Sequence, residues 1–155
     1  MPNLDRLDAA LLGELSREPR VSIVELARRL GVARGTAQAR FDRLQASGVI
    51  VGMGPEVDPA AIGYPVIAFT TLDTNQADLP ALVRHLSAIP EVLEAHTISG
   101  PGDVLCRIAA RSNQHLQEVI SRVLGGPTIQ RASTHIVLST QVRHRTTALV
   151  AAAST

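Results

Sequence analysis

Residues 22–50 read SIVELARRLGVARGTAQARFDRLQASGVI, and this stretch decides how the N-terminal part of the chain folds. Ser22 is followed by Glu25 three positions later, the spacing of a capping box at a helix start. Apolar side chains then recur at helical spacing as far as Leu30, and Gly31 stands where a left-handed helix end is needed. The sequence therefore predicts a short helix that ends at Gly31.

A second helix is expected directly after the short turn of residues 31–33. It runs over residues 34–47, with Ala37, Phe41 and Leu44 on its inner side, and Gly48 ends it. Two helices joined by so tight a turn predict a helix-turn-helix, whose second helix enters the major groove of DNA.

The residues on either side complete a small domain. Leucines at helical spacing predict a preceding helix over residues 4–16, with two aspartates in its first turn. Short apolar runs broken by Gly and Pro over residues 49–57 predict a hairpin, or wing. We expect a three-helix (winged) helix-turn-helix DNA-binding domain over residues 1–54 and a linker over 55–63.

From residue 64 the pattern changes from helical to extended. Strands are expected over residues 64–72, 92–99, 104–110 and 129–142, the last densest at 135–138, and helices over 79–88 and 113–124. This order predicts a ferredoxin-like βαββαβ domain over residues 64–145, so the whole chain is of the α+β class. The Ala-rich tail, residues 146–155, is expected to fray.

The first strand of this domain is apolar on both faces, as Val66, Ile67, Ala68 and Phe69 illustrate. Two helices can cover only one face of an antiparallel sheet. We therefore expect a second copy of the chain to cover the other face, which makes the protein a homodimer.

Composition narrows the class of protein. The chain has 155 residues, of which 45% are hydrophobic and only 2% aromatic. It therefore has few aromatic side chains on which the bases of a single strand could stack. The single cysteine excludes an intramolecular disulfide, and no apolar run is long enough for a membrane span or forms a signal peptide. We expect a cytoplasmic protein that binds double-stranded DNA.

The charge of residues 20–48 supports double-stranded DNA as the partner, since this stretch contains six arginines and only two carboxylates. Arg34, Thr36 and Gln38, near the helix start, are candidates for contacts near the bases, and Arg40 and Arg43 for phosphate contacts. The alternative is a solvated helix face. All basic residues are Arg, which suits bidentate contacts but can equally reflect genome base composition.

A second candidate site is the turn Ser99-Gly100-Pro101-Gly102-Asp103. Glycines let a ligand approach the backbone, exposed amides can bind a carboxylate, and the Asp103 carboxylate can bind an ammonium group. Those are the two charged ends of an amino acid. The alternative is an ordinary hairpin turn that Asp103 only caps.

The sequence from Leu4 to about Arg143 resembles the Lrp/AsnC family of transcription regulators. The similarity rests on Leu4-Asp5 with Asp8, on Glu25-Leu26-Ala27, on the string Arg40-Phe41-Asp42-Arg43-Leu44 leading to Gly48-Val49-Ile50, on Gly100 and Asp103, and on Thr134 before Ile136-Val137-Leu138. The resemblance implies a DNA-binding regulator whose C-terminal domain assembles dimers, often into octamers, and binds an amino-acid effector between them.

For the effector site, the resemblance adds candidates to the turn: His96, Thr134, His135 and Ile136. One position departs from the family. The residue that caps the recognition helix is usually serine, and here it is Ala33, a loss that typically costs about 1 kcal/mol.

Other classes of function were weighed against this one. The sequence has no nucleophile beside a base and no paired carboxylates in an apolar setting, so we expect no enzyme and no cofactor. His96, His135 and Cys106 lack the short spacing of a metal site, which leaves a metal sensor as a weak alternative. An architectural DNA-binding protein that ignores effectors remains open.

Overall fold

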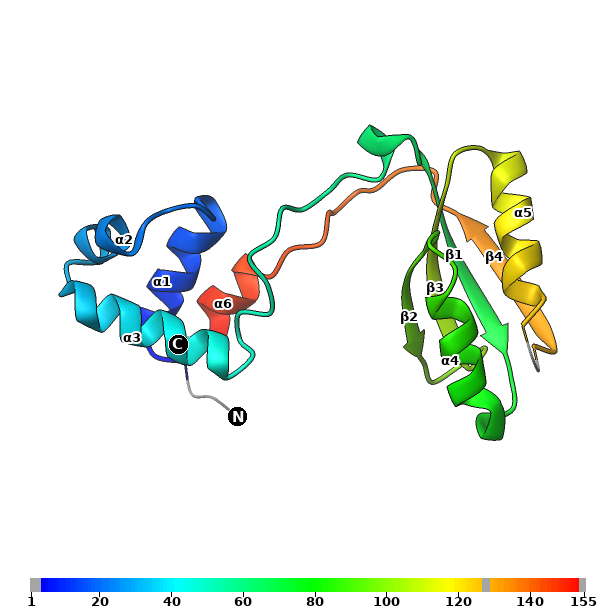
Figure 1. Cartoon of the computed structure of the whole chain (residues 1–155), viewed down its shortest axis with the longest axis horizontal. Coiled ribbons are helices and arrows are strands. Elements are labelled where there is room, and N and C mark those ends of the chain that lie inside the picture. Colours follow the sequence, from blue (N-terminus) through cyan, green and yellow to red (C-terminus); the bar gives the residue numbers. More distant parts are fainter. Residues whose placement is uncertain (1–3, 127–128, 154–155) are drawn as a thin grey trace. The chain divides into compact units, whose positions relative to one another are not determined.

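The computed structural model describes residues 4–126 and 129–153. The chain forms two compact units, one of Met1–Pro55 with Val142–Thr155 and one of Glu56–Gln141. We call them the helical unit and the sheet unit (Figure 1). No helix in the described ranges is both long and apolar enough to cross a bilayer.

The helical unit contains the three expected helices and a fourth from the C-terminus. These are α1 (Arg6–Arg17), α2 (Ile23–Leu30), α3 (Arg34–Ala46) and α6 (Thr147–Ala153). Their shared core is built from leucines, namely Leu11, Leu12, Leu15, Leu26 and Leu44. One leucine-rich core therefore fixes α3 against α1 and α2.

The turn between α2 and α3 forms as the sequence predicts. Gly31 ends α2 with φ of 67°, in the left-handed region that favours glycine, and Gly48 follows α3 with φ of 73°. The capping box is only half formed: Ser22 accepts the Glu25 N–H, but the Glu25 carboxylate binds Arg28 and Arg29 instead of reaching back.

Two expectations for the helical unit are wrong. Residues 49–57 contain no strand, so the predicted hairpin, or wing, is absent; Val49 and Ile50 instead donate their backbone N–H groups to the Leu44 carbonyl and pack on the helical core. The tail does not fray throughout, because α6 contacts α1 and Val150 packs on the same core. Residues 154–155 lie outside the described ranges.

The sheet unit has the ferredoxin-like order of elements that the sequence predicts. Its strands are β1 (Val66–Asp73), β2 (Val92–Thr97), β3 (Val104–Ala110) and β4 (Arg131–Ile136), and its helices are α4 (Leu79–Ser87) and α5 (Asn113–Leu124). The antiparallel sheet has the order β2-β3-β1-β4. Short 3-10 turns occur at Ala60–Ile62 and Gln76–Asp78.

The last strand is shorter than predicted and ends before the apolar residues 137–138. Ile136 pairs with Ala68, and the Val137 N–H reaches the Ile67 carbonyl. Pro65, two residues before Ile67, has no N–H with which to continue the ladder.

Both helices pack on one face of the sheet. Alternate residues of β1 and β3, among them Ala68, Leu72, Cys106 and Ile108, form a buried core with the leucines and valines of α4 and α5. The opposite, helix-free face carries the other parity, including Phe69, whose exposed fraction is 37%. Apolar residues on both parities explain the mixed pattern of the sequence.

Candidate functional site

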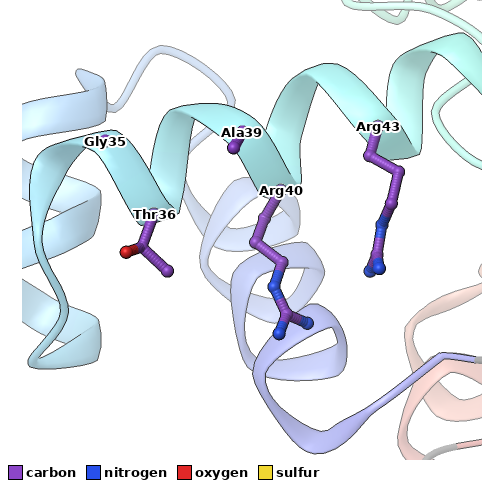
Figure 2. Close-up of a pocket in the computed structure, with 5 residues that line it drawn as sticks. All are labelled: Gly35, Thr36, Ala39, Arg40 and Arg43. Atoms are coloured by element: carbon purple, nitrogen blue, oxygen red, sulfur yellow. The ribbon is translucent and has the colours of Figure 1, made fainter.

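The outward face of α3 combines small residues with polar ones. Ala37 and Leu44 are buried on the inner side, whereas Gly35, Thr36 and Ala39 are exposed. Together with Arg40 and Arg43, these three exposed residues line a shallow hollow (Figure 2).

Figure 2 shows the side chains of Thr36, Arg40 and Arg43 pointing to the same side of α3. Gly35 and Ala39 leave the helix backbone uncovered between them, so a rigid ligand can approach the helix closely. A base edge in a groove is such a ligand, and an Ala methyl group can contact a thymine methyl.

Arg40 and Arg43 are not free, because both bind one buried carboxylate of α1. Asp8 has no exposed surface; its Oδ1 accepts Arg40 Nη1 at 3.0 Å and its Oδ2 accepts Arg43 Nη2 at 2.5 Å. Asp8 Oδ2 also accepts the Asp5 N–H, closing a capping box at the start of α1. This carboxylate therefore links the start of α1 to the middle of α3.

Asp5 adds a second carboxylate beside Arg40. The Arg40 guanidinium donates to Asp5, and this contact, with the Asp8 N–H, lowers the pKa of Asp5 from 3.8 to about 2. Arg43 is the more accessible of the two, because 54% of its side chain is exposed, against 27% for the Arg40 side chain. A guanidinium has five N–H donors, so each arginine keeps donors for a further partner.

The remaining residues predicted to contact DNA differ in whether their side chains have a partner within the described part of the chain. Gln38 donates to Asp42 at 2.8 Å, so the pair lies along the helix surface. Arg34 is exposed and has no acidic partner among the described residues. Ala33 precedes it in the extended conformation of an N-cap, with φ of −65° and ψ of 146°, but provides no side-chain cap.

The turn predicted to bind an effector is held to the sheet by Asp103. Asp103 Oδ2 accepts the Thr74 N–H at 2.8 Å, and the Asp103 N–H donates to the Leu72 carbonyl. Gly100 and Gly102 have φ of 118° and 88°. A Cβ at Gly102 would lie 3.1 Å from the Thr71 Cβ, so this glycine permits a close approach to β1. The Asp103 carboxylate therefore caps the residue that follows β1, not the turn itself, and Ser99 is exposed.

The other effector candidates are divided between the two faces of the sheet. Thr134 Oγ1 lies 3.0 Å from Oγ1 of the buried Thr70, on the helix side, and Ile136 has the same parity. His135 is paired with Phe69 on the helix-free face. His96 is paired with Leu105, which has the parity of that same face. One chain therefore does not bring the whole set into one pocket.

The same division separates the residues of the weak metal alternative. Cys106 is buried on the helix side, where desolvation raises its thiol pKa to about 11. The two histidines lie on the other face, at an edge strand each. Within residues 4–126 and 129–153, no three His, Cys, Asp or Glu side chains gather in a group that could bind a metal.

Comparisons with known proteins agree with the fold of both units. Residues 67–147 match the Lrp/AsnC ligand binding domain, and residues 4–51 match a winged helix-turn-helix DNA-binding domain. The regulatory protein AsnC of Escherichia coli strain K12 is 31% identical over 141 residues, which cover 90% of this chain and 93% of AsnC. The chain belongs to the Lrp/AsnC family.

Solved structures of Lrp/AsnC proteins have the same fold. The structure of E. coli AsnC superposes with a TM-score of 0.86 at 29% identity, covering 93% of this chain and 98% of AsnC. The feast or famine regulatory protein of M. tuberculosis complexed with L-methionine superposes with a TM-score of 0.82 at 26% identity, covering 92% and 97%. Relatives in the Lrp/AsnC family are thus helix-turn-helix transcriptional regulators.

Two groups of residues were missed by sequence reasoning. The sequence analysis places Asp8 in the first helical turn and in the family pattern but does not predict its contacts with Arg40 and Arg43, although the Asp5–Asp8 spacing is that of a capping box. The sheet unit also contains a polar cluster in which Glu91 binds Arg122 at 2.8 Å and His115 at 3.3 Å, beside Tyr64. Its members are far apart in the sequence, so no sequence motif predicts the cluster.

Proposed function

We propose that the protein is a sequence-specific transcription regulator that binds double-stranded DNA through α3. The outward face of α3 carries this proposal, because Thr36, Arg40 and Arg43 line a hollow together with the small residues Gly35 and Ala39, and Arg34 is exposed at the start of the same helix. The match to the helix-turn-helix domain and the regulators among its relatives support it.

Roles follow from position along α3. Arg34, Thr36 and Gln38 lie in the first turns, which in a recognition helix approach the base edges. Arg40 and Arg43 donate to phosphates with the N–H groups that Asp8 leaves free. The buried carboxylate then orients both guanidinium groups before DNA arrives.

Selection from a library of randomised duplexes tests the proposal. A sequence-specific regulator enriches one motif, and a dimer enriches two half-sites about one helical turn apart. Enrichment of no motif, with equal binding to all duplexes, would support the architectural alternative and contradict the proposal.

We propose further that an amino acid modulates this regulator from an interface between copies of the sheet unit. The related feast or famine regulatory protein of M. tuberculosis has been solved in complex with L-methionine. The candidates His96, Thr134, His135 and Ile136 lie on different faces of one sheet, so a shared pocket needs more than one chain. The turn of residues 99–103 supplies positive-φ glycines and the Asp103 carboxylate.

A thermal-shift screen of the twenty amino acids tests the effector. A ligand at 100 times its Kd adds about 2.7 kcal/mol to the folded state, a clear rise in Tm. Asp103→Asn should abolish the shift, whereas Asp58→Asn, a carboxylate that only caps the Ala60 N–H, should keep it. No shift with any amino acid would contradict the effector proposal and leave DNA binding standing.

A further inference from the structure

Half of the arginines of the helical unit, five of ten, are paired with its own carboxylates. Glu14, Glu18 and Glu25 bind Arg29, while Glu14 also binds Arg17 and Glu25 also binds Arg28. Asp5 and Asp8 bind the arginines of α3, as described above. Four of the six arginines of residues 20–48 are therefore engaged in ion pairs within the helical unit.

The arginines of this unit that have no acidic partner in the described residues can be named individually: Arg6, Arg20, Arg34, Arg143 and Arg145. Only Arg34 belongs to α3. Arg143 and Arg145 belong to residues 142–146, the segment that leads from the sheet unit into α6. Both are exposed, and no carboxylate lies within residues 142–155.

The helix α6, which follows residues 142–146, packs within the helical unit. The α6 helix contacts α1, and Val150 packs on the helical core together with Leu4 and Val49. Val49 lies three residues beyond the last residue of α3, and Leu4 directly precedes the Asp5 that binds Arg40. The basic segment is therefore far from α3 in sequence but belongs to the same compact unit.

We propose that residues 142–146 form a second DNA-contacting segment, in which Arg143 and Arg145 bind phosphates beside the groove that α3 enters. The inference rests on the proposed function. A major groove is only about 12 Å wide, so protein beside a recognition helix meets a phosphate strand. An unpaired guanidinium that donates to phosphate releases counterions without losing an internal ion pair.

The contact is to backbone, so it is sequence-independent and needs no operator for its test. Fluorescence anisotropy of a labelled 40-base-pair duplex of random sequence, titrated with the full chain at several salt concentrations, gives the slope of log affinity against log salt. Each of Arg143→Gln and Arg145→Gln should reduce the slope by roughly 0.9 per bound chain, and the double variant by roughly twice that.

Two further variants serve as the negative and the positive control. Arg84→Gln removes an equally exposed, unpaired arginine from α4 of the sheet unit and should leave the slope unchanged. Arg34→Gln removes the unpaired arginine of α3 and should reduce it. Unchanged urea-unfolding midpoints confirm that the variants fold, as expected for exposed side chains outside the core.

The outcomes separate this inference from the proposed function. A double variant that binds with the wild-type slope, while Arg34→Gln weakens binding, would overturn the role of residues 142–146 and leave α3 as the DNA reader. A wild-type chain that binds no duplex even at low salt would overturn both. A reduced slope in the double variant, with Arg84→Gln unchanged, supports the second contact.

Discussion

At the residue scale, Asp8 connects the helical fold to the arginines of α3. Replacing it with alanine removes the hydrogen bond that Asp8 Oδ2 accepts from the Asp5 N–H in the capping box and the two charge-assisted hydrogen bonds from Arg40 and Arg43, while both arginines regain water. We expect Asp8→Ala to lower the free energy of unfolding by about 2 kcal/mol in urea denaturation. Asp42→Ala, which removes only the exposed contact with Gln38, should change it little, and equal losses in both variants would contradict the role of Asp8.

Two carboxylates give the helical unit a defined acid response. Arg40 holds the pKa of Asp5 at about 2, and Arg28, followed by Arg29, holds that of Glu25 at about 2. The unfolded chain binds more protons at these groups, so their stabilisation is complete above about pH 5 and is lost as the pH falls from about 4.5 to 2.

Unfolding midpoints measured from pH 7 to pH 2.5 check this response. Glu25→Gln should flatten the acid decline relative to wild type, because the variant has lost the carboxylate with the lowered pKa. An identical decline in both proteins would show that the Glu25 ion pairs contribute nothing to it.

At the element scale, the start of α3 is left without a cap. Ala33 already has the extended backbone of an N-cap, so serine can be placed there without rearrangement. We expect Ala33→Ser to raise the free energy of unfolding by about 1 kcal/mol in urea denaturation. Ala39→Ser, in the middle of the same helix, should not stabilise, and a gain there equal to that at position 33 would contradict a capping effect.

The elements that the sequence predicts well are those with local causes. The end of α2 follows from Gly31, and the first three strands follow from their apolar residues and the turn at 100–103. The wing was predicted wrongly and the docking of α6 was not predicted, because both outcomes depend on packing on the helical core, as Val49 and Val150 show.

The site shows the same contrast. The exposed face of α3 follows from helical periodicity, so the accessibility of Arg34 and Thr36 is as expected. That Arg40 is held by α1 depends on a contact between residues 32 positions apart, which no local pattern reveals.

At the scale of the whole molecule, the helix-free face of the sheet is expected to join two copies. Phe69 is partly exposed at its centre, and Arg107 beside it binds Glu94 at 2.9 Å. We expect wild type to sediment as a dimer or larger assembly and Phe69→Arg to shift it to monomer. Val83→Arg, on the exposed side of α4, should keep the wild-type mass.

Sedimentation velocity would contradict this arrangement in two ways. A monomeric wild-type chain would leave the face without its proposed partner. An unchanged assembly in Phe69→Arg would place the interface elsewhere. Pairing matters to function because one short recognition helix has few contacts, and two joined copies gain affinity through effective concentration.

We expect the outward face of α3 to read DNA sequence. The most direct test of this expectation is the affinity ratio between a selected duplex and its scrambled counterpart at one fixed salt concentration, measured for wild type and for the Arg34→Ala/Thr36→Ala variant. We predict a ratio of at least about 10³ for wild type and at least a tenfold lower ratio for the variant, with Arg17→Ala as an unaffected control. A variant that keeps the full wild-type ratio would contradict the claim.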